Sequence, residues 1–192
     1  MKRNKRDLIL EAAVQVFSSK GYHNTRMEEI AALAGIGKGT IYEYFDSKLQ
    51  LFQEMLEESL KIYYERMDAS RQGHMGFAES MYLFFRSHLE FCQEKKELTR
   101  ILFWDVENFD EELKDWGYQI RKQKEEALID LIKESINRGE LRNVNSRLLA
   151  QIIMGSLGSL WVPITLEGWD INPDTLARQL IDMLMNGIKR GI

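Results

Sequence analysis

Residues 25–48 constrain the fold more than any other segment, because two short helical patterns in it are separated by only three or four residues. Thr25 and Glu28 have the spacing of a capping box, which marks the start of the first helix. Gly35 suits the left-handed conformation that ends a helix, and Gly37 suits the start of the next one. The segment therefore predicts a tight helix-turn-helix whose second helix is free to enter a major groove of DNA.

The second helix, at about residues 38–45, has two chemically different faces. Ile41 and Phe45 lie one turn apart on an apolar face that can anchor the helix. The polar face carries Lys38, Thr40, Tyr42 and Tyr44. This division is typical of a recognition helix that reads DNA with one side and packs with the other.

Residues 8–48 contain a longer pattern around this motif, which includes Ala12-Ala13-x-x-x-Phe17, Gly21-Tyr22, Ile30-Ala31-x-x-Ala34-Gly35 and Thr40-Ile41-Tyr42-x-Tyr44-Phe45-x-Ser47-Lys48. This pattern resembles the DNA-binding domain of the tetracycline-repressor (TetR) family. The resemblance covers roughly the first quarter of the chain and is specific in residue type and spacing.

The resemblance implies a set of DNA contacts. Gly37 and Gly39 would permit close approach of the backbone, and Lys48 would combine its charge with a helix N-terminus to hold a phosphate. The implied contacts are Thr25, Arg26, Gly37, Lys38, Gly39, Thr40, Tyr42, Tyr44 and Lys48.

Composition favours an all-α protein of nine helices, since helix formers dominate and the chain has only 2 prolines. We expect two domains, a three-helix DNA-binding unit at 1–47 and a ligand-binding and dimerisation domain at 48–192. Outside the motif, the expected helices are at about 4–20, 48–68, 77–92, 98–106 and 111–137, followed by one from 146 and one from 173.

The net charge of −4 is unevenly distributed along the chain. Residues 1–48 carry a net charge of +2 and the remainder carries −6, so the basic excess accompanies the motif. Lys2, Arg3, Lys5 and Arg6 form a basic arm that can reach phosphates or a minor groove. The alternative is a solvated chain end without a partner.

Cysteine usage and hydropathy predict a cytoplasmic protein without a membrane partner. Cys92 is the only cysteine, so no internal disulfide can form, and no signal-peptide pattern follows the basic arm. No uninterrupted apolar run reaches the roughly 18 residues of a membrane-spanning helix.

The sequence supports none of three possible catalytic or ligand sites. Residues 35–40 suggest a phosphate-binding loop, but Gly39 interrupts the required Gly-Lys-Ser/Thr order. His88 and Cys92 are four residues apart and could share a metal, yet no second such pair completes a coordination shell. No nucleophile and base can be paired. We expect no enzyme activity, no metal and no cofactor.

The expected helix at 77–92 is apolar over much of its circumference, which is typical of a helix that is buried or lines a cavity. Core packing is the alternative interpretation for each aromatic residue. In proteins of the resembled family, the corresponding helices enclose an inducer. The candidate contacts for a hydrophobic or amphipathic effector are Phe84, Phe85, His88, Phe103, Trp104, Trp116 and Trp161.

The expected helix from 146 is rich in small residues, which destabilise a helix but let another helix approach closely. The resemblance implies that this helix and the one from 173 pair with their copies in a homodimer. The alternative is a core within one chain. The candidate interface comprises Ile152, Gly155, Ser156, Ser159, Leu176, Leu180, Met183 and Leu184.

These features predict a homodimeric, ligand-responsive repressor of transcription that binds double-stranded operator DNA. Two alternatives remain: a small-molecule binding protein of the same fold without DNA binding, which Glu28, Glu29 and Glu43 favour because they repel phosphates, and an enzyme that uses the apolar pocket. Residues 137–142 and 186–188 resemble regulators of fatty-acid metabolism more than regulators of drug efflux.

Overall fold

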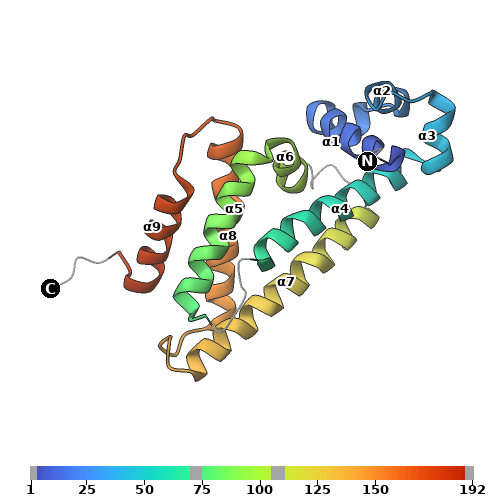
Figure 1. Ribbon diagram of the computed structural model, residues 1–192. Helices are drawn as coiled ribbons and strands as arrows, with labels where there is room; N and C mark the ends of the chain where they lie inside the picture. The colour runs from blue at the N-terminus through green and yellow to red at the C-terminus, as the bar shows by residue number, and fades with distance from the viewer. Residues whose placement is uncertain (1–3, 70–74, 105–110, 189–192) are drawn as a thin grey trace. The chain divides into compact units, whose positions relative to one another are not determined.

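A computed structural model describes residues 4–69, 75–104 and 111–188, without the side chains of 68, 69, 103, 104, 112 and 113 (Figure 1). Within these ranges every regular element is a helix, which confirms the all-α prediction. The helices are α1 (Lys5–Asn24), α2 (Met27–Leu33), α3 (Lys38–Tyr44), α4 (Lys48–Ala69), α5 (Phe77–Glu94), α6 (Lys96–Trp104), α7 (Glu111–Asn137), α8 (Ser146–Thr165) and α9 (Pro173–Asn186).

The helices form two compact units. One comprises Met1–Ile62 and Lys95–Asp115, and the other comprises Tyr63–Glu94 and Trp116–Ile192. Helix α4 contributes its first part to one unit and its last part, from Tyr63, to the other.

The first unit has an aromatic core beneath the helix-turn-helix. Phe17 of α1 meets Phe52 of α4 edge to face, with ring centres 4.7 Å apart, and both side chains are buried. Tyr22 lies against the same ring at 4.9 Å. Ile41 and Phe45 complete the anchor of α3, since neither has any exposed surface. Burial of each such side chain contributes about 1.5–3 kcal/mol to the stability of the folded state. The core therefore fixes α3 through its apolar face.

In the second unit, α5 packs against α8 and α9 (Figure 1). Its buried side chains include Met81, Phe85 and Leu89. Helix α7 adds the buried Ile132, and α8 adds Ile153 and Trp161 among its buried residues. Many residues of α5 are buried, as expected of a helix that is either buried or lines a cavity.

Several predicted helix ends are confirmed by their hydrogen bonds. Asn145 accepts from the backbone N–H of Leu148 at 3.1 Å, and Asn172 accepts from Thr175 at 2.9 Å directly before Pro173. These contacts satisfy N–H groups that have no partner within a helix.

Gly21 interrupts α1 where the break was predicted, with non-helical φ 74° and ψ 166°, and a short further helical stretch continues to Asn24. The end of α6 differs from the prediction. Helix α6 begins at Lys96, two residues earlier than expected, and its expected last residues, 105 and 106, lie outside the described residues. Helix α4 begins as predicted, with Ser47 accepting from the N–H of Gln50 at 3.1 Å.

Helix α8 is long and apolar enough by length and composition to cross a membrane, although polar residues interrupt its apolar run. Only 28% of its most apolar window is buried within the chain. A buried core helix of a soluble protein passes the same test, but α8 leaves most of this surface uncovered. Part of the apolar surface of α8 is thus not covered within the single chain.

Candidate functional site

The turn between α2 and α3 has the hydrogen bonds of a Schellman motif. The N–H of Ile36 donates to the carbonyl of Ala31 at 3.0 Å, and the N–H of Gly35 donates to Ala32 at 3.2 Å. Gly35 has φ 70°, a left-handed conformation in which a side chain is strained. The predicted role of Gly35 is confirmed, and the turn fixes how α3 leaves α2.

Helix α3 presents the polar face that its sequence predicts. Tyr42 and Tyr44 are 44% and 38% exposed, unusually high values for large aromatic residues within a helix. Lys38 and Gly39 are also exposed, and Thr40 is half-buried. The exposed phenols and cation can therefore meet a partner without any loss of core packing.

Lys38 and Glu28 form an ion pair between α3 and α2, with 2.7 Å between Nζ and the carboxylate oxygen. The hydrogen bond from Lys38 lowers the pKa of Glu28, and the same bond raises the pKa of Lys38. Both groups are thus charged at neutral pH. The pair places an acidic group beside the cation of the candidate recognition helix.

Thr25 and Arg26 precede α2, and here the predicted capping box is displaced by one residue. Thr25 is buried, its hydroxyl donates to the carbonyl of Gly21 at 2.8 Å, and it lies one residue before the N-cap of α2. The N-cap is instead the exposed Arg26, whose N–H donates to Glu29 at 3.2 Å. The reciprocal Thr25–Glu28 box was therefore wrong.

Lys48 and the basic arm have partners within the first unit. The ammonium of Lys48 donates to the carbonyls of Tyr22, His23 and Thr25. Arg6 lies in α1 and pairs with Glu54. Lys2 and Arg3 lie outside the described residues. The part of the predicted arm that the structure describes is thus helical.

The candidate effector residues fall into three groups. Phe85, His88 and Trp161 are buried in the second unit, whereas Phe84 and Trp116 are half-buried. The side chains of Phe103 and Trp104 lie outside the described residues.

His88 has a polar contact at each ring nitrogen. Nδ1 lies 2.9 Å from the hydroxyl of Tyr63, and Nε2 lies 3.2 Å from the carbonyl of Leu157. Burial lowers the pKa of His88 from 6.5 to about 4 and raises the pKa of Tyr63 well above its usual value. Sγ of Cys92 also lies 3.5 Å from Nε2, so both ring nitrogens have partners within the chain, as in the packed histidine that is the alternative to a metal ligand.

Tyr63 is a site residue that sequence reasoning missed. It lies within the expected helix at 48–68 and was not among the candidate site residues, although a buried tyrosine hydroxyl requires a polar partner. The fifth helix is apolar and contains a single histidine. This histidine, together with the need of a buried tyrosine for a polar partner, is the signal that could have suggested the pairing of Tyr63 with His88.

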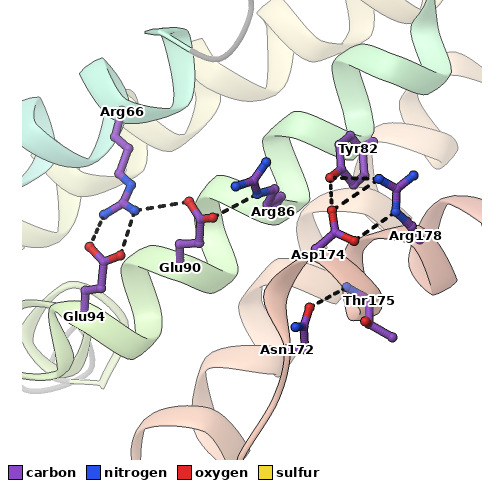
Figure 2. Close-up of polar contacts among 9 residues, drawn as sticks. All are labelled: Arg66, Tyr82, Arg86, Glu90, Glu94, Asn172, Asp174, Thr175 and Arg178. Atoms are coloured by element: carbon purple, nitrogen blue, oxygen red, sulfur yellow. Dashed lines mark hydrogen bonds and ion pairs between the residues drawn. The ribbon is translucent and has the colours of Figure 1, made fainter.

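A polar cluster joins α5 to α9 (Figure 2). The hydroxyl of Tyr82 donates to Asp174, and Nε of Arg178 donates to the same carboxylate at 2.9 Å. The guanidinium of Arg178 also lies 4.8 Å from the centre of the Tyr82 ring. Hydrogen bonds from Arg178 and Tyr82 lower the pKa of Asp174. The cluster holds one side of α9 against α5.

The candidate interface residues of α8 follow one helix face. The candidates Ile152, Gly155 and Ser159 recur at intervals of three and four residues and are exposed, and the exposed Leu148, four residues before Ile152, extends this face. Leu148 is 59% and Ile152 is 56% exposed, which is high for side chains of this type. On the same helix Ser156 is half-buried, and on α9 the half-buried Leu176, Leu180 and Leu184 accompany the exposed Met183. Both helices therefore present uncovered apolar surface.

Comparisons with known proteins agree with this geometry. Residues 9–55 match the sequence model described as "Bacterial regulatory proteins, tetR family", and residues 76–188 match "Tetracyclin repressor-like, C-terminal domain". The chain is 26% identical to the "Fatty acid metabolism regulator protein" of Bacillus subtilis, with 97% of each chain covered. It is 33% identical to the HTH-type transcriptional regulator YhgD of Bacillus subtilis, over 72% of this chain and 71% of that protein.

Solved structures show the same fold. The transcriptional regulator FadR from Bacillus subtilis, in complex with stearoyl-CoA, superposes with a TM-score of 0.84 and 24% identity. The superposition covers 95% of this chain and 99% of that one. The two sequence models together span both the helix-turn-helix and the C-terminal helices, and the second alone matches more than half of the chain. The chain therefore belongs to the TetR family of transcriptional regulators, a family of DNA-binding proteins that are not enzymes.

Proposed function

We propose that this chain is a cytoplasmic, homodimeric repressor that binds operator DNA and releases it when a long-chain acyl thioester binds. Residues 1–47 would form the DNA-binding domain, and residues 48–192 would bind the effector and form the dimer. The observation that carries the proposal is the exposed polar face of α3 on a buried apolar anchor, within a TetR-family helix-turn-helix.

Exposure and charge support the proposed DNA contacts. Arg26, Lys38, Tyr42 and Tyr44 are exposed on or beside the helix-turn-helix. Thr40 and the backbone at Gly37 and Gly39 would contribute where α3 begins. Thr25 would act indirectly by holding Arg26 in place, because its hydroxyl, N–H and carbonyl oxygen are all bonded within the chain. Phenols and cations of this kind contact phosphates and base edges in major-groove complexes.

The uncovered faces of α8 and α9 support the proposed dimer. A Cβ atom added at Gly155 or Gly158 would meet nothing within 4 Å in the single chain, so neither glycine is required by packing within that chain. Glycine at such positions lets a second helix approach closely. A helix-turn-helix protein that reads two half-sites needs a two-fold partner, and these faces would provide it.

The effector class is supported by the relatives. One relative is named as a regulator of fatty-acid metabolism, and a structure of the same fold contains stearoyl-CoA. A long acyl chain suits apolar, aromatic surroundings such as Phe85 and Trp161. The bound effector would shift the chain toward the conformation that does not fit the operator. The size of the shift is set by the difference between the effector's affinities for the two conformations.

The proposal can be tested with a fluorescent duplex that the protein itself selects from a random-sequence library. Stearoyl-CoA should release the duplex, whereas coenzyme A should not, and stearate would show whether the thioester is needed. Because coupling is reciprocal, the duplex should weaken binding of stearoyl-CoA by the same factor. Failure to select any duplex would contradict DNA binding, and release by none of the three compounds would contradict the effector class.

A further inference from the structure

A series of polar contacts runs from the residue after α3, through α4, to the start of α1. The backbone N–H of Asp46 donates to Oε1 of Gln50 at 2.7 Å, and Nε2 of Gln50 donates to Oε1 of Glu54 at 3.0 Å. The other carboxylate oxygen of Glu54 accepts from the guanidinium of Arg6 at 2.5 Å. All four residues belong to the first unit. We call Asp46, Gln50, Glu54 and Arg6 the junction network.

The network closes on itself at the end of α3. Phe45 is the C-cap of α3, has no exposed surface and directly precedes Asp46. The guanidinium carbon of Arg6 lies 5.8 Å from the centre of the Phe45 ring, within cation–π range. Arg6 thus contacts Phe45 directly and is also connected, through the junction network, to the residue that follows it. The point at which α3 ends is therefore held by α1 and by α4.

The junction network requires a carboxylate at position 54. A backbone N–H can only donate, so the Gln50 side chain presents its carbonyl oxygen to Asp46 and its NH2 group to Glu54. A guanidinium also can only donate. Glu54 therefore has a donor on each side, and its two oxygens accept one hydrogen bond each. A glutamine at this position would present an NH2 group to one of these two donors.

We propose that Glu54 is a positioning residue for DNA recognition, which fixes the end of α3 by orienting the Gln50 amide toward the N–H of Asp46. This inference rests on the proposed function. Glu54 is half-buried and has the same sign of charge as a phosphate, so a direct contact with DNA is unfavourable. Its effect on DNA binding passes through the position of α3.

The place of Asp46 in the chain connects the network to recognition. Tyr42 and Tyr44 are exposed on α3, and Tyr44 lies two residues before Asp46. A shift of the α3–α4 junction therefore moves Tyr44 with it. Specific binding needs base contacts in register, whereas nonspecific binding depends mainly on phosphate charge. Loss of the network consequently lowers specific affinity more than nonspecific affinity.

Glu54→Gln separates positioning from electrostatics, because the two effects have opposite signs. Removal of a negative charge raises the affinity for any duplex. Loss of the network lowers the affinity for a duplex that the wild-type chain selects from a random-sequence library. The ratio of affinities for the selected duplex and a scrambled one should fall roughly tenfold, which corresponds to the loss of about one base contact. Glu58→Gln, at an exposed position one turn further along α4, is the control and should keep the wild-type ratio.

Gln50→Met breaks the network without any change of charge. Methionine has a similar length, but it can neither accept from Asp46 nor donate to Glu54. Affinity for the selected duplex should fall on the order of tenfold, while the salt slope and the affinity for the scrambled duplex match wild type. A wild-type affinity ratio in both Glu54→Gln and Gln50→Met would overturn the inference. An equal loss of affinity for both duplexes would overturn it as well.

Amide exchange without DNA tests the junction network itself. Arg6→Met removes the far end of the network, so the N–H of Asp46 should exchange with water severalfold faster than in wild type. Lys5→Met is the control, because it removes a neighbouring exposed cation that is not part of the network. Unchanged exchange at Asp46 in Arg6→Met would overturn the inference.

A measurement on the wild-type chain does not depend on how well the variants fold. NMR spectra should show a coupling across the hydrogen bond between the amide nitrogen of Asp46 and the side-chain carbonyl carbon of Gln50. The coupling should persist when the selected duplex is bound, and its loss on binding would overturn the inference. Failure of the wild-type chain to select any duplex would instead overturn the proposed function, whatever the coupling shows.

Discussion

The hydroxyl of Tyr63 in α4 lies 2.9 Å from Nδ1 of His88 in α5, and both side chains are buried. The other ring nitrogen of His88 lies 3.2 Å from the carbonyl oxygen of Leu157, which can only accept. Nε2 therefore carries a proton. Because burial lowers the pKa of His88 to about 4, the ring is neutral at neutral pH, and Tyr63 donates to Nδ1. One imidazole thus joins the end of α4 to α5 and α8 within the second unit.

The free energy of unfolding should decrease as the pH is lowered, because His88 is buried in its neutral form. Burial lowers its pKa from 6.5 to about 4, so between these values the unfolded chain binds a proton that the folded chain does not. The contribution of His88 is complete above pH 6.5 and is lost progressively as the pH falls to about 4, a total of about 3 kcal/mol. Urea unfolding at a series of pH values should show this loss in wild type and not in His88→Gln. An equal loss in both proteins would assign it to other groups.

Removal of the Tyr63 hydroxyl should destabilise the second unit. Tyr63→Phe keeps the ring, which contacts Phe91 with centres 5.1 Å apart, but leaves Nδ1 of His88 without this donor. An unsatisfied buried acceptor costs about 1–3 kcal/mol, which corresponds to roughly 2–4 °C of melting temperature for each kcal/mol. Tyr64→Phe is the matched control, since Tyr64 is half-buried and its ring, which Lys124 approaches to 4.1 Å, remains. Equal melting temperatures for the two variants would contradict this role of Tyr63.

Contacts between residues close in sequence were largely predictable, because glycine, asparagine and proline act over a few residues. Gly35, Asn172 and the faces of α3 followed from such signals. Contacts across the fold were not predictable in this way. Lys48 donates to the carbonyl of Tyr22, and the hydroxyl of Tyr63 contacts His88. No pattern of neighbouring residues predicts either contact.

The error at Thr25 arises from competing partners nearer in sequence. The spacing of Thr25 to Glu28 fits a capping box, yet the buried Thr25 donates its hydroxyl hydrogen to the carbonyl of Gly21, four residues earlier. Glu28 in turn pairs with Lys38 of the next helix. Other partners can thus bond the polar groups of a local motif that the sequence contains in full.

The proposed dimer predicts that Gly155→Leu disrupts assembly while the single chain folds. A Cβ atom added at this position meets no atom within 4 Å in one chain, but a leucine side chain would prevent close approach of a second helix. Analytical ultracentrifugation should then show monomers or aggregates with helical circular dichroism. Gly117→Leu in α7 is the control, because a Cβ atom there is equally free of contacts. A Gly155→Leu variant that stays dimeric would show that the interface lies elsewhere.

The ion pair between Lys38 and Glu28 should restrain nonspecific DNA binding. Its two charges are 2.7 Å apart, and the carboxylate both opposes the Lys38 charge and repels phosphates. Glu28→Gln keeps the size of the side chain and removes its charge, so affinity for a scrambled duplex should rise roughly threefold to tenfold and the salt slope should steepen by up to about 0.9. Folding should change little, because exposed ion pairs contribute little to stability. Glu57→Gln changes the net charge equally at an exposed position of α4, and a similar gain in affinity there would show that net charge, rather than this pair, limits nonspecific binding.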